Sequence, residues 1–335
     1  MAFLFGQSLN KTEILRRVGD ISQMAGALPF EYTFGKAKGT RAIEIRNGSG
    51  LRFVVLPDRG MDIAYAEYKG TAVSYISKTG ITSPSHYNEQ DFSRSFYGGL
   101  LTTCGLTYMG ASCIDEGIAL GAHGRISNIP AFDVGITQEW CGDEFIISVK
   151  GKVQESTLFG ENIVLTRTIT TKLGKDEISI HDAIENVGFE PTPLMVLYHM
   201  NFGYPLFSEE AVFETNCGGL RARDEEANKG IEKTNKFSKP VHGYKEQVFY
   251  RNSVENSYAL LKNEKIGLTA KVEYDGTELP YLIEWKQVGE QDYVLGIEPA
   301  TYPPDGRAKA RKRGELLYLQ PQKNKFHSIT ISFSR

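Results

Sequence analysis

The chain has 335 residues, of which 41% are hydrophobic and 24% charged, with a formal net charge of -3 at pH 7. This composition is that of a folded globular protein and excludes a disordered or collagen-like chain. The near balance of charge gives no overall attraction to nucleic acid or to an anionic membrane.

The first twenty residues, MAFLFGQSLNKTEILRRVGD, lack the basic segment and long apolar run of a secretory signal. No stretch has the roughly 18 apolar residues of a membrane helix. The four cysteines show no CxxC spacing and the six histidines no HxH or HxxxH pair, so we expect neither a metal site nor a cofactor. We expect reduced cysteines and a cytoplasmic location, with no nucleic-acid or membrane partner.

The N-terminal segment predicts one short capped helix near residues 10–24, because Asn10 precedes Glu13 at capping spacing. From about residue 30, hydrophobic and polar residues alternate. Residues 41–46 and 51–56 flank an Asn-Gly pair, which is a strong hairpin signal. Further strands are expected over residues 61–68, 71–76, 145–150, 163–172, 177–184, 194–202, 246–250, 257–262, 266–274, 281–287, 293–298 and 326–334.

So many short strands without a fixed repeat are typical of an all-β sandwich or barrel. Residues 221–239 form the most polar segment, which we interpret as a solvated loop because the strand patterns on its two sides are alike. We therefore predict a single domain over residues 1–335, with residues 1–30 as a helical extension packed on it.

Residues 195–205 (MVLYHMNFGYP) predict a strand with one apolar face and with His199 and Asn201 on the other. Gly203 and Pro205 end the strand, so both polar side chains lie near its end. The histidine either lines a cleft or is a core residue bonded to a backbone carbonyl, and the local sequence leaves both open.

A second candidate is Glu298, which ends an apolar strand and precedes Pro299. A carboxylate there is costly to bury unless it is hydrogen-bonded or used. Burial would raise its pKa toward a value that suits a general base. The alternative is a solvated carboxylate at the rim of the sheet.

Two further segments carry groups that suit sugar binding. In GAHGRISNIPA (121–131), an extended backbone would place His123 and Arg125 on one side, where they could hold hydroxyl groups. In PYLIEWK (280–286), Trp285 could stack on a sugar ring, with Lys286 beside it. The alternatives are a surface hairpin for the first segment and a core tryptophan for the second.

In chain order, these segments resemble the galactose mutarotase-like (aldose 1-epimerase) superfamily, in particular its DUF4432-type branch. The resemblance covers most of the chain and implies an all-β, single-domain β-supersandwich fold with a short N-terminal helix. The stretches that carry it are LPDRGMDIAYAEYKG (56–70), FYGGLLTTCGLTYMG (96–110), GAHGRISNIPA (121–131), LYHMNFGYPLF (197–207), VLGIEPATYPPDG (294–306) and GRAKARKRGELLYLQP (306–321).

The resemblance also implies residue roles. His199 would be the general acid and Glu298 the general base of an isomerase that opens and closes the ring of a small reducing sugar, so that its anomers interconvert. We expect the two groups to face each other across a cavity with room for one monosaccharide between them. The expected substrate-binding residues are His123, Arg125, Asn201, Trp285 and Lys286, and the reaction needs no metal or cofactor.

The sequence leaves alternatives open. One is a non-catalytic carbohydrate-binding protein of the same fold, although a pure binder needs no acid–base pair. Another is a lyase or glycoside-active enzyme, for which paired carboxylates or a helical domain would be usual. The basic run 307–313 either contacts a phosphorylated or acidic sugar or lies on a solvated loop. The identity of the sugar and the formation of a homodimer are not decided by the sequence.

Overall fold

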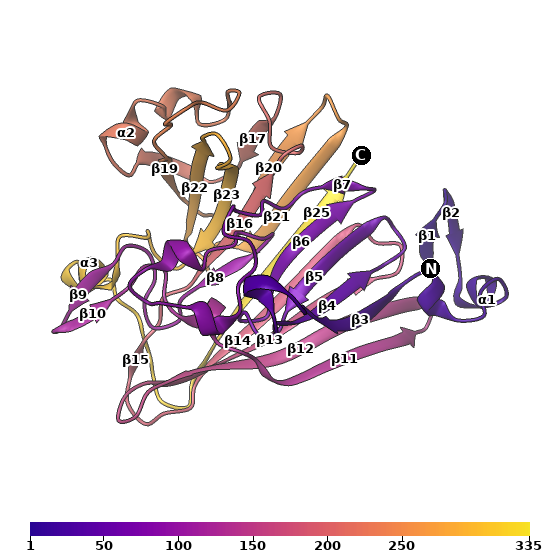
Figure 1. Cartoon of the computed structure of the whole chain (residues 1–335), viewed down its shortest axis with the longest axis horizontal. Coiled ribbons are helices and arrows are strands. Elements are labelled where there is room, and N and C mark those ends of the chain that lie inside the picture. Colours follow the sequence, from indigo (N-terminus) through magenta and orange to yellow (C-terminus); the bar gives the residue numbers. More distant parts are fainter.

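The structure is a computed structural model that describes residues 1–335, and it consists mainly of antiparallel strands (Figure 1). The largest sheet has eight strands in the order β11-β12-β13-β14-β25-β21-β20-β17. Along β12, β13 and β14 buried residues occur at every second position, so this sheet packs one face inward. The strands are β11 (Phe132–Cys141), β12 (Glu144–Ser156), β13 (Asn162–Lys172), β14 (Glu177–Asn186), β17 (Val212–Thr215), β20 (Asn256–Asn263), β21 (Leu268–Asp275) and β25 (Asn324–Ser334).

A second sheet has six strands in the order β18-β19-β22-β23-β16-β8. Every residue of β16 and β23 is buried, so both faces at the centre of this sheet are covered. The strands are β8 (Thr102–Cys104), β16 (Leu197–Gly203), β18 (Gly218–Ala222), β19 (Gln247–Asn252), β22 (Tyr281–Val288) and β23 (Tyr293–Ala300).

A third sheet has the order β3-β4-β5-β6-β7. The hairpin predicted at the Asn-Gly pair is confirmed, because the strands on its two sides pair in antiparallel register. The strands are β3 (Gly26–Glu31), β4 (Arg41–Arg46), β5 (Leu51–Leu56), β6 (Asp62–Tyr68) and β7 (Thr71–Ala72).

Three strand pairs and three short helices complete the fold. The pairs are β1 (Ala2–Leu4) with β2 (Gln7–Leu9), β9 (Cys113–Asp115) with β10 (Ile118–Leu120), and β15 (Thr192–Pro193) with β24 (Tyr318–Leu319). The helices are α1 (Lys11–Leu15), α2 (Glu225–Asn228) and α3 (Arg307–Lys312). No helix has the length and apolar character that crossing a membrane requires. The predicted all-β class is confirmed.

Two local predictions need correction. The helix expected near residues 10–24 is only α1, which has the predicted capping box of Asn10 and Glu13. It ends at Leu15 with Arg16 as its C-cap, and Asp20 then caps a separate 3-10 turn at Ile21–Gln23. The segment 221–239 is not simply a loop, since it holds the end of β18, the helix α2 and a second 3-10 turn at Ile231–Lys233.

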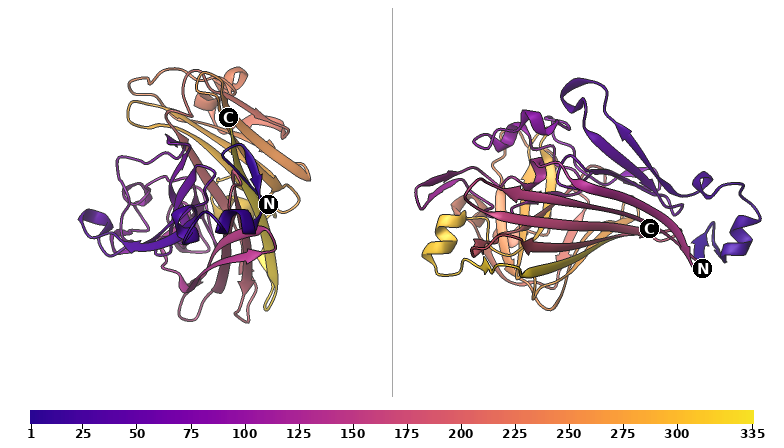
Figure 2. Two further views of the ribbon diagram at one scale, coloured as in Figure 1. Left: turned by 90° about the vertical axis from the view of Figure 1, so that its right-hand side faces the viewer. Right: turned by 90° about the horizontal axis from the view of Figure 1, so that it is seen from below.

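One hydrophobic cluster of 56 buried residues draws on all three large sheets, so these sheets share a core. Ala2, Leu4 and Ile14 belong to this cluster, so the N-terminal segment is packed against the body of the protein. Figure 2 shows this segment at one end of the molecule, beyond the long strands of the eight-stranded sheet.

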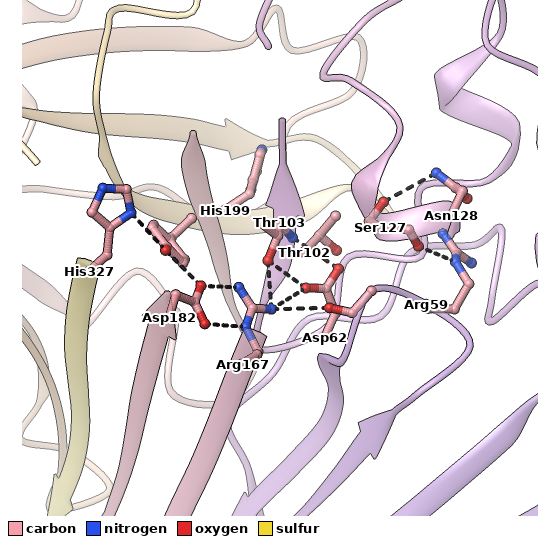
Figure 3. A network of polar contacts seen from close by, with 12 residues as sticks. Arg59, Asp62, Thr102, Thr103, Ser127, Asn128, Arg167, Asp182, His199 and His327 are labelled. Atoms are coloured by element: carbon pink, nitrogen blue, oxygen red, sulfur yellow. Dashed lines mark hydrogen bonds and ion pairs between the residues drawn. The ribbon is translucent and has the colours of Figure 1, made fainter. Parts of the chain in front are cut away.

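A network of buried charged side chains lies close to β16 (Figure 3). Arg167 of β13 donates to both oxygens of Asp182 on β14 at 2.9 and 2.7 Å, and its Nη1 lies 2.9 Å from Oδ1 of Asp62. The hydroxyl of Tyr198 in β16 donates to Asp182 at 2.7 Å. Successive strand residues point to opposite faces. The network therefore fixes β16 from the face opposite to His199.

Candidate active site

The two residues expected to perform acid–base chemistry lie on neighbouring strands of the six-stranded sheet. Ile283 of β22 is opposite Glu298 of β23, and Met200 of β16 is opposite Ile297. This register places His199 beside Glu298. Opposed residues of paired strands point to the same face of a sheet, so the imidazole and the carboxyl group meet.

The imidazole and the carboxyl group are in direct contact. Nε2 of His199 lies 3.2 Å from Oε1 of Glu298. Their alignment is not that of a hydrogen bond, so Oε1 of Glu298 has no hydrogen-bond partner. The other ring nitrogen of His199, Nδ1, has no partner either. The predicted gap for a monosaccharide between the two groups is therefore wrong, because cross-strand neighbours have Cβ atoms only about 5 Å apart. A ligand has to lie alongside this pair.

Gly296 provides the space that the Glu298 side chain occupies. A Cβ atom at Gly296 would lie 2.4 Å from Oε1 of Glu298 and 3.0 Å from Cβ of Trp285. Glu298 and Gly296 are two residues apart on one face of β23, so the carboxyl group leans along the strand over the glycine. The absence of a side chain at position 296 therefore helps to set the position of the carboxyl group.

Burial controls the protonation of both groups. It raises the pKa of Glu298 well above its ordinary value, and the nearby Glu246 adds to this effect while Arg223 opposes it. Burial also lowers the pKa of His199 well below its ordinary value, and His123 contributes in the same direction. Burial thus favours the form in which the imidazole and the carboxyl group are both neutral. Relative to a neutral imidazole and a carboxylate, this form has one additional proton, which the two groups can exchange.

Aromatic rings enclose the pair. The His199 ring lies 5.1 Å from Phe96, 5.2 Å from Trp285 and 5.9 Å from His123, measured between ring centroids. His123 is held at a left-handed backbone angle (φ 61°), its Nδ1 is buried without a partner, and burial lowers its pKa to about 4. A buried polar atom without a partner is unusual in proteins, and this one lies beside His199.

A cavity of about 890 Å³ opens onto these groups. His199, Glu298, His123 and Trp285, four of the seven residues expected at the site, line it. Further lining side chains include the aromatic residues Tyr75, Phe92 and Phe96 and the charged residues Lys78, Asp91, Arg223, Asp224, Glu246, Asp292, Asp305 and Lys309.

Arg125 does not line the cavity. The backbone at residues 123–128 is not extended as expected, because His123 turns it into the left-handed region and a 3-10 turn begins at Ile126. The guanidinium group of Arg125 instead lies 2.9 Å from Glu89 and 3.4 Å from Glu155. These ion pairs give Arg125 a structural environment, and we leave it out of the proposed site.

Asn201 and Lys286 also lie outside the cavity lining. The amide of Asn201 donates to the backbone carbonyl groups of Gly99 and His199, at 3.1 and 2.9 Å, and is fully buried. Lys286 follows Trp285 in β22, so strand alternation points it to the opposite face. There its Nζ donates to two backbone carbonyl groups of the segment 233–236.

The sequence interpretation missed three residues from the polar segments around β18 and β19. Arg223 lies between the carboxylates of Asp224 and Glu246, at 2.7 and 2.8 Å, and all three line the cavity. Glu246 also accepts a hydrogen bond of 2.7 Å from the indole nitrogen of Trp285. A charged run in a polar segment usually faces solvent, and nothing in its local pattern signals this contact.

Residues 307–312 of the basic run form the helix α3 and not a solvated loop, and Arg313 is its C-cap. Arg307 and Arg311 both bind Asp115 at the start of the connection between β9 and β10, at 2.7 and 2.8 Å. Arg313 pairs with residues 305 and 315. Lys309 is the one member of the run that lines the cavity.

The fold and the cavity define a β-sandwich protein with a buried histidine–glutamate contact at a cavity wall, and comparison with known proteins gives its family. A family model described as a domain of unknown function, DUF4432, matches residues 37–333. The chain therefore belongs to the DUF4432 family. A search of curated proteins found no match.

Solved structures share the fold. A candidate aldose 1-epimerase of Klebsiella pneumoniae is 22% identical, with a TM-score of 0.85 over 93% of this chain and 88% of that one. A galactose mutarotase-like protein of Clostridium acetobutylicum is 14% identical (TM-score 0.65, covering 93% and 99%), and a galactose 1-epimerase of Lactobacillus acidophilus is 14% identical (0.62, 92% and 99%). The chain thus has the galactose mutarotase-like β-sandwich fold.

Proposed function

We propose that this protein is an isomerase of the aldose 1-epimerase type, which interconverts the anomers of a reducing sugar. The observation that carries the proposal is the buried contact of 3.2 Å between His199 and Glu298 on the wall of a cavity of about 890 Å³. The superfamily resemblance and the similar solved structures support it. The four free cysteines agree with a cytoplasmic location, which we include in the proposal.

Direct contact between the acid and the base suits this reaction. Opening the ring of an aldose requires proton transfer at two oxygen atoms, the ring oxygen and the C1 hydroxyl. Both are bonded to the same carbon, so they are close neighbours. Two catalytic groups side by side can therefore reach both oxygens of a sugar whose C1 edge faces the pair.

The single proton held by the pair is sufficient. Moving the shared proton from Glu298 to His199 gives the charge-separated form of the pair, which burial disfavours and which is the reactive form. In it the imidazolium donates a proton to the ring oxygen while the carboxylate removes the proton of the C1 hydroxyl. The bond between C1 and the ring oxygen breaks, C1 becomes an aldehyde, and the pair is left with both groups neutral. Rotation about C1–C2 and the reverse transfers on the other face of the aldehyde give the other anomer.

A rate measurement tests this proposal. Freshly dissolved, anomerically pure aldoses, including pentoses, deoxy sugars and sugar phosphates, are followed by polarimetry or proton NMR with and without the protein. We expect at least one aldose to equilibrate faster than its spontaneous rate. If sugars bind and all of them equilibrate at the spontaneous rate, the alternative of a non-catalytic binding protein is correct.

The pH dependence is a second test. Binding of a second proton to the pair leaves no group that can accept a proton, so it inactivates the pair. Because burial lowers the pKa of His199, this second proton binds only well below pH 6.5. The pH at which the pair loses its shared proton is raised, since burial raises the pKa of Glu298. We therefore expect kcat, corrected for the spontaneous reaction, to stay constant as the pH falls from 7.5 through 6.5. A decrease with an apparent pKa near 6.5 would contradict this assignment.

A third prediction concerns Gly296. In Gly296→Ala the new methyl group has to displace the Glu298 carboxyl group, because it would lie 2.4 Å from Oε1. We expect kcat to fall by about 10-fold to 100-fold, the effect of a small misplacement of a reacting group. The control is Gly135→Ala in β11, where a Cβ atom meets no atom within 4 Å. Equal rates for the two variants would show that Gly296 does not position the carboxyl group.

A further inference from the structure

The cavity extends well beyond the acid–base pair. Ile283, Trp285 and Gln287 point to one face of β22, and all three line it. At a rise of about 3.3 Å per residue, the four steps from Ile283 to Gln287 cover about 13 Å. Because Glu298 is opposite Ile283, the lining continues along β22 for this length beyond the pair. That length exceeds one pyranose ring.

A second hollow continues in the same direction. It has a volume of about 340 Å³, it is formed by residues 242–244 and 289–292, and it shares Gln287 and Asp292 with the main cavity. The main cavity of about 890 Å³ is itself near the upper end of the range of about 300–1,000 Å³ for pockets that hold drug-sized ligands. The combined space is more than a single hexose needs.

The far part of the cavity carries the groups that bind sugar hydroxyls. Nζ of Lys78 lies 2.7 Å from Asp292, and the hydroxyl of Tyr75 lies 3.5 Å from the same carboxylate. Ser77 and Gln287 also line the cavity. The Ser77 hydroxyl donates to the carbonyl group of Phe96 at 2.7 Å and the Gln287 oxygen accepts from the backbone of Gly289 at 2.8 Å, which leaves the Gln287 amide nitrogen as a donor. Because Lys78 is already paired with Asp292, this part offers no free cation to a phosphate, and its neutral donors and acceptors suit an uncharged sugar.

We propose that the natural ligand is a reducing disaccharide or a longer reducing oligosaccharide. Its reducing ring lies beside His199 and Glu298, and its second ring extends along β22 toward Gln287 and Asp292. This inference rests on the proposed function for the orientation of the reducing end. The length of the cavity and the polar groups at its far part support it independently.

The first test measures binding without turnover. Lactose, maltose and cellobiose, with glucose and galactose for comparison, are titrated into Glu298→Gln by calorimetry. We expect at least one disaccharide to bind 10-fold or more tightly than either monosaccharide. Equal or weaker binding of all three disaccharides would overturn the inference, whether or not the wild-type protein is an isomerase.

The second test locates the second ring. The ratio of kcat/KM for the preferred disaccharide to that for its reducing-end monosaccharide is measured for wild type, Gln287→Ala and Gln23→Ala. Gln23 is an exposed residue in a 3-10 turn near the N-terminus. We expect the ratio to fall about 10-fold in Gln287→Ala and to stay at the wild-type value in Gln23→Ala. An unchanged ratio in Gln287→Ala would overturn the placement of the second ring.

The two proposals fail in different ways. If the protein accelerates the interconversion of monosaccharide anomers but binds no disaccharide more tightly than a monosaccharide, the isomerase proposal stands and the proposal of a larger ligand is overturned. Preferential disaccharide binding with no acceleration of any aldose overturns the isomerase proposal and supports the larger ligand. If Gln287→Ala does not fold, as judged by its thermal unfolding, the calorimetric comparison decides the inference.

Discussion

Glu298→Gln and His199→Asn are each expected to lower the catalysed rate of anomer interconversion by a factor of about 10²–10⁴, the usual contribution of general acid–base catalysis. Each substitution removes one end of the proton exchange while keeping a polar side chain of similar shape. The rate is measured by polarimetry as the acceleration over the spontaneous reaction. Because burial favours the neutral carboxyl group of Glu298, its neutral amide replacement should leave thermal unfolding almost unchanged.

Matched controls separate this effect from general damage. Glu264→Gln and His86→Asn change the same residue types at exposed positions away from the cavity, and we expect wild-type rates from both. The double variant Glu298→Gln/His199→Asn should be no slower than the slower single variant, because the two groups act as one proton-exchanging unit. Additive losses in the double variant, or near wild-type rates in either single one, would contradict the proposed pair.

Arg167→Met is expected to destabilise the fold by about 3–5 kcal/mol, which is the usual loss when one partner of a buried ion pair is removed. The guanidinium group is fully buried between Asp62 and Asp182, and without it two buried carboxyl groups lose the cation that contacts both of them. The free energy of unfolding is measured by urea titration. The exposed Arg94→Met is the control, with an expected change within about 0.5 kcal/mol.

The pH dependence of the Arg167→Met loss checks its cause. Burial raises the pKa of Asp62 to about 6 even beside Arg167. A carboxyl group whose pKa is raised on folding favours the folded state at low pH and loses that contribution as the pH rises through the folded value. The loss in Arg167→Met should therefore be larger above about pH 6, where Asp62 is ionised beside Arg167 in the wild type, than below it, where Asp62 is protonated in both proteins. A loss that is independent of pH would show that packing, and not unpaired charge, is responsible.

The two faces of each strand were predictable from the sequence because alternation is a local property. Residues 197–203 carry His199 and Tyr198 on opposite faces, and the structure places them on opposite sides of β16, one at the cavity and one in the buried network. The same rule separates Trp285 from Lys286. The prediction placed Trp285 and Lys286 at the same site, although adjacent residues of a strand point to opposite faces of the sheet.

Other features of the site depend on contacts between distant parts of the chain. The register between β16 and β23 decides that His199 and Glu298 are neighbours, and it joins residues about one hundred positions apart. Arg223 and Glu246 come from polar segments that resemble any solvated loop in sequence. A left-handed turn at His123 sends Arg125 to carboxylates outside the cavity.

The sequence by itself thus determined the all-β class, the inward and outward faces of its strands, and the positions of an imidazole and a carboxyl group near strand ends. Hydrophobic alternation is enough for this, because it depends only on neighbouring residues. Only the tertiary structure shows the contact between His199 and Glu298, the charged residues around them and the length of the cavity. These depend on strand pairing and loop packing, which minimise the free energy of the whole chain and leave no local pattern in the sequence.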